Sequence, residues 1–393
     1  MNDLPRGFKS GTAAAAFKKA GRDDLGLIVS EFPCVVSGLF TQNRFQAAPV
    51  QICREILRNS GPVRAVLANS GQANACTGEQ GLENCRATQR MVAERINLVP
   101  EEILPLSTGV IGPQLPMDRW RAAVPKLVES LGSRDAEAFT RAFMTTDAFP
   151  KFAARGLDLS AGHTRLTVMA KGAGMICPNM ATMLCVVLTD AMVEQNSWRS
   201  MFKRAADKTF NRVSVDGDTS TNDTILGLAN GASVPIKTEA DLTLFEESLT
   251  EILGSVAYML VKDGEGAAKV IHITVRGACS DADAALAARS VGHSQLVKTA
   301  IYGGDANWGR IVTAIGYSGA DFEPAEVCLS LCGIERFVKG RPVDDDQEEI
   351  LSDLLKARDI HVDISLGSGP GSYVFLASDL GHEYVSLNAD YRS

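Results

Sequence analysis

One threonine in this chain has surroundings that suit covalent catalysis. Thr182 follows a loop of small residues at 172–174 and a Pro-Asn turn at 178–179, and it precedes six apolar residues at 183–188. A threonine hydroxyl is a weak nucleophile unless a base lies beside it, and the residue's own α-amino group can be that base. That amine exists only if the chain is cut before Thr182. A loop of small residues suits such a cut, because the hydroxyl must reach the preceding carbonyl group.

The sequence around this threonine, PNMATML, resembles the self-cleavage site of the ornithine acetyltransferases, the glutamate N-acetyltransferase family of arginine biosynthesis. The alternative is a threonine that starts a strand and hydrogen-bonds within its own turn. Further stretches resemble the same family in order along the chain, which favours the catalytic interpretation. These stretches are NSGQANACTG (69–78), STGVIG (107–112), DGDTSTND (216–223), KDGEG (262–266) and NADYRS (388–393). In GGDANWG (303–309), Ala306 stands where the family usually has proline.

The resemblance implies a role for particular residues. The chain would cut itself between Ala181 and Thr182 into an α chain, 1–181, and a β chain, 182–393, with Thr182 as the nucleophile. Thr108 and Gly109 would form the oxyanion hole. The substrate contacts of the family fall on Thr145, Lys171, Thr182, Glu265, Asn388 and Ser393.

The residue types at these positions fit such roles. Acyl transfer develops negative charge on a carbonyl oxygen, and Thr108-Gly109 offers a hydroxyl and an unobstructed N–H to stabilise it. Lys171 could meet a substrate carboxylate, and Glu265 could meet an ammonium group. Each feature also has an ordinary explanation, because Ser/Thr/Gly turns are common and most charged side chains are solvated.

By resemblance, the acetyl group of N-acetylornithine would pass to glutamate through an acetyl-Thr182 intermediate, with acetyl-CoA as a second candidate donor. The resemblance also implies an α2β2 heterotetramer of the two chains and no metal or bound cofactor. The alternatives are an aminopeptidase or amidase with an N-terminal nucleophile, and a non-catalytic amino-acid-binding relative. No GxSxG motif is present, and the histidines (163, 272, 293, 361 and 382) lie outside the matching stretches, which favours the amine as base.

Composition excludes several other classes of function. The formal net charge of −8 argues against a nucleic-acid-binding surface. No stretch has the roughly 18 apolar residues of a membrane span, and the N-terminal segment lacks the apolar core of a signal peptide. Nine cysteines, an odd number, predict reduced thiols in a cytoplasmic protein. DGDTSTND lacks the glycine and the glutamate that a calcium loop needs at its sixth and twelfth positions.

The pattern of apolar residues predicts a mixed α/β protein. Strands are expected at 63–68, 164–170 and 183–188, with a helix at 82–96. We also expect a helix from Ile225, a hairpin at GSGPGS (367–372) and a strand at 384–387. The resemblance adds stacked β-sheets flanked by helices, the fold of ornithine acetyltransferases and related aminopeptidases, with a smaller second region.

Overall fold

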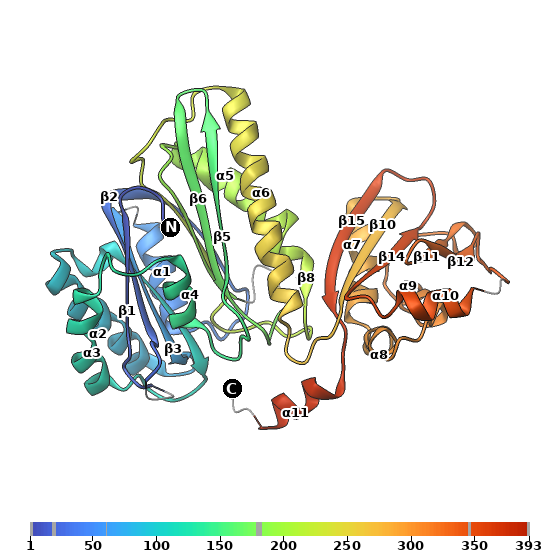
Figure 1. Cartoon of the computed structure of the whole chain (residues 1–393), viewed down its shortest axis with the longest axis horizontal. Coiled ribbons are helices and arrows are strands. Elements are labelled where there is room, and N and C mark those ends of the chain that lie inside the picture. The colour runs from blue at the N-terminus through green and yellow to red at the C-terminus, as the bar shows by residue number, and fades with distance from the viewer. Residues whose placement is uncertain (1–2, 18–20, 60, 178–182, 345–346, 391–393) are drawn as a thin grey trace. The chain divides into compact units, whose positions relative to one another are not determined.

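The computed structural model describes residues 3–17, 21–59, 61–177, 183–344 and 347–390. They form two compact units (Figure 1). Unit 1 holds residues 1–211 and 218–260, and the smaller unit 2 holds residues 212–217 and 261–392. Each unit has its own mixed sheet with helices, which confirms the predicted mixed α/β class. Among the described residues, no helix combines the length and the apolar character needed to cross a membrane.

The sheet of unit 1 is built around a long strand, β2. The first part of β2 pairs with β1 and β3, and its second part pairs with β9. The pairing of β2 with β3 shifts its register between Val29 and Cys34. The order is β4 (Ile103–Val110), β3 (Val63–Gln72), β2 (Leu25–Phe40), β9 (Thr224–Ala229), β7 (Leu184–Thr189), β6 (Gly162–Lys171) and β5 (Lys151–Leu159), with β1 (Phe8–Ala13) also paired with β2.

Helix α4 shows how an amphipathic pattern places a loop. It begins after Asp135, whose carboxylate caps the helix by accepting the N–H of Ala138. Phe139 and Phe143, one turn apart, are buried against each other and face β1, β2 and β6. The helices of unit 1 are α1 (Ala48–Arg58), α2 (Gly78–Ile96), α3 (Met117–Glu129), α4 (Ala136–Phe143), α5 (Gln195–Lys208) and α6 (Glu239–Lys262), with 3-10 turns at Pro100–Glu102 and Phe210–Arg212.

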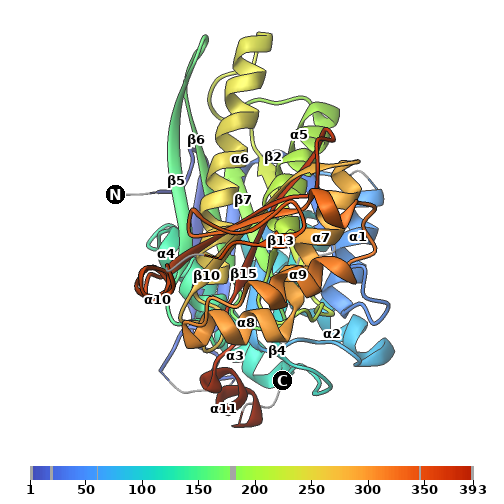
Figure 2. The same ribbon diagram turned by 90° about the vertical axis from the view of Figure 1, so that its right-hand side faces the viewer.

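The β5–β6 hairpin runs beside α6 in both ribbon views (Figures 1 and 2). Arg155 on β5 forms an ion pair with Glu251 on α6. At the hairpin turn, Ser160 donates its N–H and its hydroxyl to Asp241 near the start of α6. The turn end of the hairpin is therefore fixed by one aspartate, and its open end carries Lys151 and Lys171.

Unit 2 packs its helices against its own sheet. The small residues of α7 lie on β10 and β15, next to the inward residues Ile271, Ile273 and Val275. The sheet order is β13 (Arg341–Pro342), β12 (Ile334–Val338), β11 (Cys328–Leu331), β14 (Asp359–Ser365), β10 (Val270–Ala278), β15 (Gly371–Ser378) and β8 (Val213–Ser214). The helices are α7 (Asp281–His293), α8 (Gln295–Gly303), α9 (Trp308–Gly316), α10 (Glu348–Leu354) and α11 (His382–Asp390), with a 3-10 turn at Pro324–Glu326.

Three predictions of local structure are wrong. The residues from Ile225 form strand β9 and not a helix. Their short apolar run fits the period of a helix or of a strand, and pairing with β2 and β7 on its two sides makes it a strand. The GSGPGS segment is a crossover rather than a hairpin, since β14 and β15 pair with opposite edges of β10. Residues 384–387 belong to helix α11.

Candidate active site

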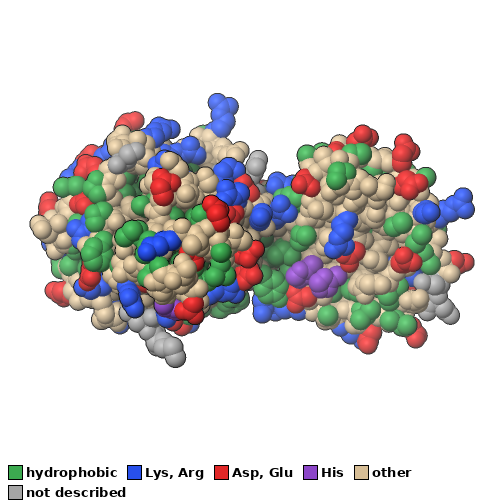
Figure 3. All heavy atoms as spheres, turned by 90° about the horizontal axis from the view of Figure 1, so that it is seen from above, with side chains coloured by type: hydrophobic (Ala, Val, Ile, Leu, Met, Phe, Trp, Pro, Cys, Tyr) green, Lys and Arg blue, Asp and Glu red, His purple; other side chains and the backbone are tan. Residues whose placement is uncertain are grey.

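The distribution of charged side chains on the face drawn in Figure 3 does not mark a binding site. Lysine and arginine side chains lie among aspartate and glutamate side chains there, with no continuous block of one sign. Among the described residues, no group of three or more His, Cys, Asp or Glu is placed to hold a metal ion.

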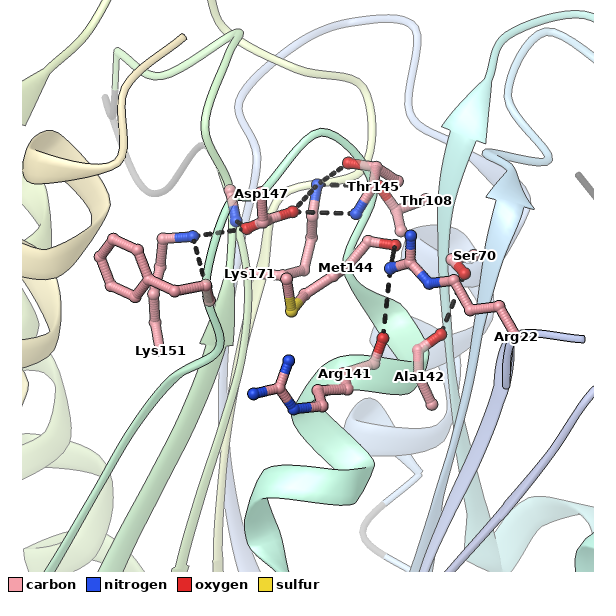
Figure 4. A network of polar contacts seen from close by, with 12 residues as sticks. Arg22, Ser70, Thr108, Arg141, Ala142, Met144, Thr145, Asp147, Lys151 and Lys171 are labelled. Atoms are coloured by element: carbon pink, nitrogen blue, oxygen red, sulfur yellow. Dashed lines mark hydrogen bonds and ion pairs between the residues drawn. The ribbon is translucent and has the colours of Figure 1, made fainter. Parts of the chain in front are cut away.

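Three of the predicted residues converge at the end of β6 (Figure 4). Lys171, the last residue of β6, is 8% exposed. Its ammonium group donates to Thr145 Oγ1 at 2.8 Å and to Thr108 Oγ1 at 3.3 Å. These residues come from the end of β6, the segment after α4 and the end of β4, so the fold assembles what the sequence keeps far apart.

A carboxylate that sequence reasoning missed holds this group together. Asp147 accepts the N–H of Thr145 at 2.9 Å, the N–H of Gly172 at 2.6 Å and the ammonium of Lys151 at 2.7 Å. The side chains of Asp147 and Lys151 are completely buried, and Lys171 Nζ lies 4.0 Å from Asp147 Oδ2. A clue in the sequence was the four-residue spacing of Asp147 and Lys151.

Asp147 is an anion at neutral pH. Burial by itself raises the pKa of Asp147, because it penalises the charged form. The positive charges of Lys171 and Lys151, with the hydrogen bonds from Lys151 and the Thr145 N–H, outweigh burial and hold that pKa well below its ordinary value of 3.8. The carboxylate therefore stays paired with both ammonium groups.

The Thr145 segment is anchored through the end of α4 (Figure 4). Arg22 donates to the carbonyl oxygens of Met144 and Arg141, at 2.9 and 3.3 Å. Ser70, in the NSGQANACTG stretch, donates its hydroxyl to the Ala142 carbonyl at 2.9 Å. The carbonyl groups that a helix end leaves without partners are satisfied in this way. The polar end of β3 therefore helps to fix the segment that carries Thr145.

Gly109 occupies a position that only glycine can fill. Its φ of +130° lies in a region that residues with a side chain rarely adopt. A Cβ atom there would lie 2.3 Å from the carbonyl carbon of Gly71. The β3–β4 ladder is irregular at this point, because Gln72 pairs with both Thr108 and Val110. This close approach explains the glycine; its predicted role in an oxyanion hole stays a prediction.

The DGDTSTND stretch ties β9 to the ends of β3 and β4. Asn222 donates its amide N–H groups to the carbonyl oxygens of Ala73 at 2.6 Å and Ser107 at 2.8 Å. Ser107 in turn donates its hydroxyl to Asn69 at 2.6 Å. Three of the stretches singled out in the sequence therefore form one hydrogen-bonded group beside Thr108 and Gly109 at the end of β4.

The predicted cleavage site, Ala181 and Thr182, lies outside the described residues, as does Ser393. Both flanks of the cleavage segment are described. Lys171 on β6 pairs with Leu184 on β7, and the Met183 carbonyl accepts the N–H of Thr224 at 2.9 Å. The chain therefore leaves the sheet and rejoins it beside the cluster of Lys171, Thr145 and Thr108.

The other predicted substrate residues belong to unit 2. Asn388 on α11 donates to Glu265 Oε2 at 2.9 Å. Glu265 lies in the loop between α6 and β10, and Gly266 in this loop has a φ of +68°. The glycine lets the loop approach α11 closely, because a Cβ atom there would lie 2.4 Å from the Tyr384 backbone nitrogen. Asp379, just after β15, accepts the N–H of Ala268 at 2.9 Å. The structure therefore brings together two of the predicted residues, at a partly exposed position.

Comparisons with known proteins decide the family. The sequence profile of the ArgJ family matches residues 9–393. The chain belongs to the ArgJ family. The arginine biosynthesis bifunctional protein ArgJ of Nitratidesulfovibrio vulgaris is 56% identical over 393 residues, which cover 100% of both chains. The protein of the same name from Geobacter sulfurreducens is 47% identical over 392 residues, 99% of each. The family predicted from the motifs is thereby confirmed.

A solved structure agrees with this assignment. The crystal structure of the arginine biosynthesis bifunctional protein argJ from Bacillus halodurans is 37% identical and aligns with a TM-score of 0.51. The alignment covers 53% of this chain and 100% of that chain. In this member of the ArgJ family, Lys171, Thr145 and Thr108 present an ammonium and two hydroxyls at one point. Such a group can hold a carboxylate or stabilise a developing oxyanion.

Proposed function

We propose that this protein is an acetyltransferase of arginine biosynthesis that moves the acetyl group of N-acetylornithine to glutamate. Acetyl-CoA is the second acetyl donor, in keeping with the word bifunctional in the names of its relatives. The single observation that carries the proposal is the convergence of Lys171, Thr108 and Thr145 beside the two flanks of the segment that contains Thr182.

The chain cuts itself between Ala181 and Thr182 to give an α chain, 1–181, and a β chain, 182–393. The sheet of unit 1 supports a product that stays together. Strands β7 and β9 come from the second piece and lie between β2 and β6 from the first. Separation of the pieces would break the β2–β9 and β6–β7 ladders and expose the buried strand β7. The α and β chains then associate as an α2β2 heterotetramer in the cytoplasm.

In the proposed mechanism, the freed amine of Thr182 takes the proton of its own hydroxyl. An α-amine has a pKa of about 7.7–8.0, which suits a base near neutral pH. The oxygen attacks the acetyl carbonyl, and the Thr108 hydroxyl and Gly109 N–H stabilise the oxyanion. The amine base returns its proton to the ornithine nitrogen as the C–N bond breaks. The glutamate amine then attacks the acetyl-Thr182 ester, and the ester C–O bond breaks. The α-amine of Thr182 takes the proton that the glutamate nitrogen loses and passes it to the Thr182 oxygen.

The contact between Lys171 and Thr108 supports the oxyanion role. Thr108 Oγ1 accepts a hydrogen bond from the Lys171 ammonium at 3.3 Å, so the threonine's own hydroxyl proton remains available to donate. A donor oriented before the reaction begins costs no reorganisation in the transition state. Lys171 and Thr145 also contact the substrate carboxylate, Glu265 contacts the ornithine ammonium, and Asn388 and Ser393 complete the substrate contacts.

The experiment is an intact-mass measurement with N-terminal sequencing of freshly purified protein, beside a Thr182→Ala variant. We expect two chains from the wild type, the second beginning Thr-Met-Leu-Cys, and one full-length chain from the variant. A full-length chain in both samples would remove the amine base and contradict the mechanism. Kinetics with N-acetylornithine and glutamate should then give parallel double-reciprocal lines. Ornithine release at a rate that does not respond to glutamate would instead indicate a hydrolase.

A further inference from the structure

We propose that Asp147 is a positioning residue of this site. Its carboxylate holds the Lys171 ammonium against the hydroxyls of Thr145 and Thr108 and fixes the start of the loop that leads to the cleavage site. The inference rests on the proposed function, because it assigns a task to a residue beside the substrate contacts. Asp147 acts through these residues and touches no reacting atom.

The contacts of Asp147 divide between its two oxygens. Oδ2 accepts the N–H of Thr145 at 2.9 Å and lies 4.0 Å from Lys171 Nζ. Oδ1 accepts the Lys151 ammonium at 2.7 Å and the Gly172 N–H at 2.6 Å. One carboxylate therefore joins the segment after α4, the start of β5 and the end of β6. A change at this one residue alters all three attachments.

Lys151 is the anchor from which Asp147 acts. Its side chain is completely buried, and its ammonium also donates to the Phe149 carbonyl at 3.3 Å and lies 5.1 Å from the centre of the Phe149 ring. These contacts hold Lys151 in place and leave its charge facing Asp147. The carboxylate is thus fixed on its inner side and presents its other oxygen toward Lys171.

The negative charge matters because two ammonium groups lie close to it in a buried place. Without the charge of Asp147, Lys151 and Lys171 would repel each other where little water screens them. Lys171 has the more exposed side chain of the two, at 10% against 0%, so Lys171 is the one that moves. Its movement would break the contacts with Thr145 and Thr108 on which the proposed substrate binding depends.

The contact with Gly172 concerns a separate event. Gly172 is the first residue after β6, and its φ of +150° sets the direction in which the chain leaves the sheet. The hydrogen bond to Asp147 Oδ1 holds this departure point. Loss of that bond should therefore slow self-cleavage, whereas displacement of Lys171 should weaken substrate binding.

The test compares Asp147→Asn with a matched control, Asp241→Asn, in the full chain. Asp241 is also buried, 5% exposed, and accepts two hydrogen bonds from Ser160, at 2.8 and 2.5 Å. It lies at the turn end of the same hairpin whose open end carries Lys151 and Lys171. For Asp147→Asn we expect slower self-cleavage and KM values for the amino-acid substrates raised by about tenfold to a hundredfold, with a smaller change in kcat. Asp241→Asn should stay within about twofold of wild type in both constants.

A double variant separates the effect of charge from the effect of shape. In Asp147→Asn with Lys151→Met, the second buried ammonium is gone and no longer repels Lys171. If Asp147 acts through its charge, KM in this double variant lies closer to the wild-type value than the raised KM of Asp147→Asn does. A structural role limited to hydrogen bonds predicts instead that the two losses add. A folded Asp147→Asn protein with both constants within about twofold of wild type would overturn the inference.

Crystal structures of the Asp147→Asn and Asp241→Asn variants give a readout that does not depend on activity. We expect Lys171 Nζ to leave Thr145 Oγ1 in the first variant and to keep the 2.8 Å contact in the second. If the wild type transfers no acetyl group, the proposed function fails, and these structures still decide the role of Asp147. An unmoved Lys171 in Asp147→Asn would refute that role even in an active enzyme.

Discussion

Each unit contains a buried aspartate that ties a loop with predicted substrate residues to its sheet, and the two carboxylates lie in opposite surroundings. Asp147 in unit 1 faces two ammonium groups, which hold its pKa well below the ordinary value. Asp379 in unit 2 accepts the Ala268 N–H, while its buried Oδ2 has no hydrogen-bond partner among the described residues. Burial raises the pKa of Asp379, although its backbone hydrogen bonds and the charges of Lys269 and Lys298 oppose the rise.

The difference extends to the substrate residues themselves. Lys171 is buried and held by two hydroxyls and a nearby carboxylate, so its ammonium is in place before a substrate arrives. Glu265 and Asn388 hold each other through one exposed hydrogen bond. Charge pairing thus orders the candidate site of unit 1, whereas a close approach of backbones at Gly266 orders the loop of unit 2. Lys171 in unit 1 therefore has more contacts that hold its charged group than Glu265 in unit 2.

The largest expected effect comes from neutralising the two aspartates in turn. Asp147→Asn should lower the free energy of unfolding by about 3–5 kcal/mol, because it removes a buried negative charge that faces two ammonium groups. Asp379→Asn should lower the free energy of unfolding by no more than about 1 kcal/mol, and an increase is also consistent with the comparison. The variant removes a poorly solvated charge and keeps the hydrogen bond from the Ala268 N–H. Urea unfolding at pH 7 in the Thr182→Ala background keeps each protein as one chain. Equal losses in the two variants would contradict the comparison.

A smaller effect is expected where glycine permits a close backbone contact. Gly109→Ala places a Cβ atom 2.3 Å from the backbone of Gly71, whereas Gly112→Ala, also at positive φ, meets nothing within 4 Å. In unit 2, Gly266→Ala and Gly217→Ala form the corresponding pair. The first member of each pair should lose about 1–3 kcal/mol more unfolding free energy than the second. Identical thermal shifts within a pair would show that the close contact contributes nothing.

Acidification should change the contributions of Asp147 and Asp379 to folding stability in opposite directions. The pKa of Asp147 is lower in the folded state than its ordinary 3.8, so its stabilising effect is complete above about pH 4 and is lost as the pH falls further. The pKa of Asp379 is raised, so ionisation above pH 3.8 works against the folded state. Between pH 6 and pH 3, stability should therefore fall less steeply in Asp147→Asn than in wild type, and more steeply in Asp379→Asn. Denaturation midpoints across this range check both slopes, and parallel slopes would refute the assignment.

The sequence could predict which residues come together in the candidate site of unit 1, but not the carboxylate that holds them in place. Lys171, Thr108 and Thr145 were expected from the family resemblance, and the fold does bring them together. Asp147 was missed because its contacts with Gly172 and Lys171, at the end of β6, form only when the chain folds. Its spacing from Lys151 is a weak signal, since most lysines and aspartates that lie near each other in sequence are solvated.

The same limit applies to local structure. Strand β7 could be predicted because its apolar run is buried on both faces of a central strand. Strand β9 could not, since its six residues fit a helix or a strand and the neighbours β2 and β7 decide between them. Helix α11 has no buried residue, so it carries no apolar pattern from which a helix could be predicted.

The smallest change in stability, and the sharpest in specificity, is expected from Glu265→Gln. The new amide oxygen can still accept the Asn388 hydrogen bond, so unfolding free energy should stay within about 0.5 kcal/mol of wild type. The lost negative charge should weaken binding of the ornithine substrate, which carries a side-chain ammonium, by about tenfold or more. Glutamate lacks that group and should be affected less. KM values for both substrates test this prediction, and Asn388→Ala is the control that keeps the charge of Glu265. An equal rise in KM for the two substrates would show that Glu265 does not contact the ammonium group. Lys171 would then be the one charged substrate contact that the comparison of the two units supports.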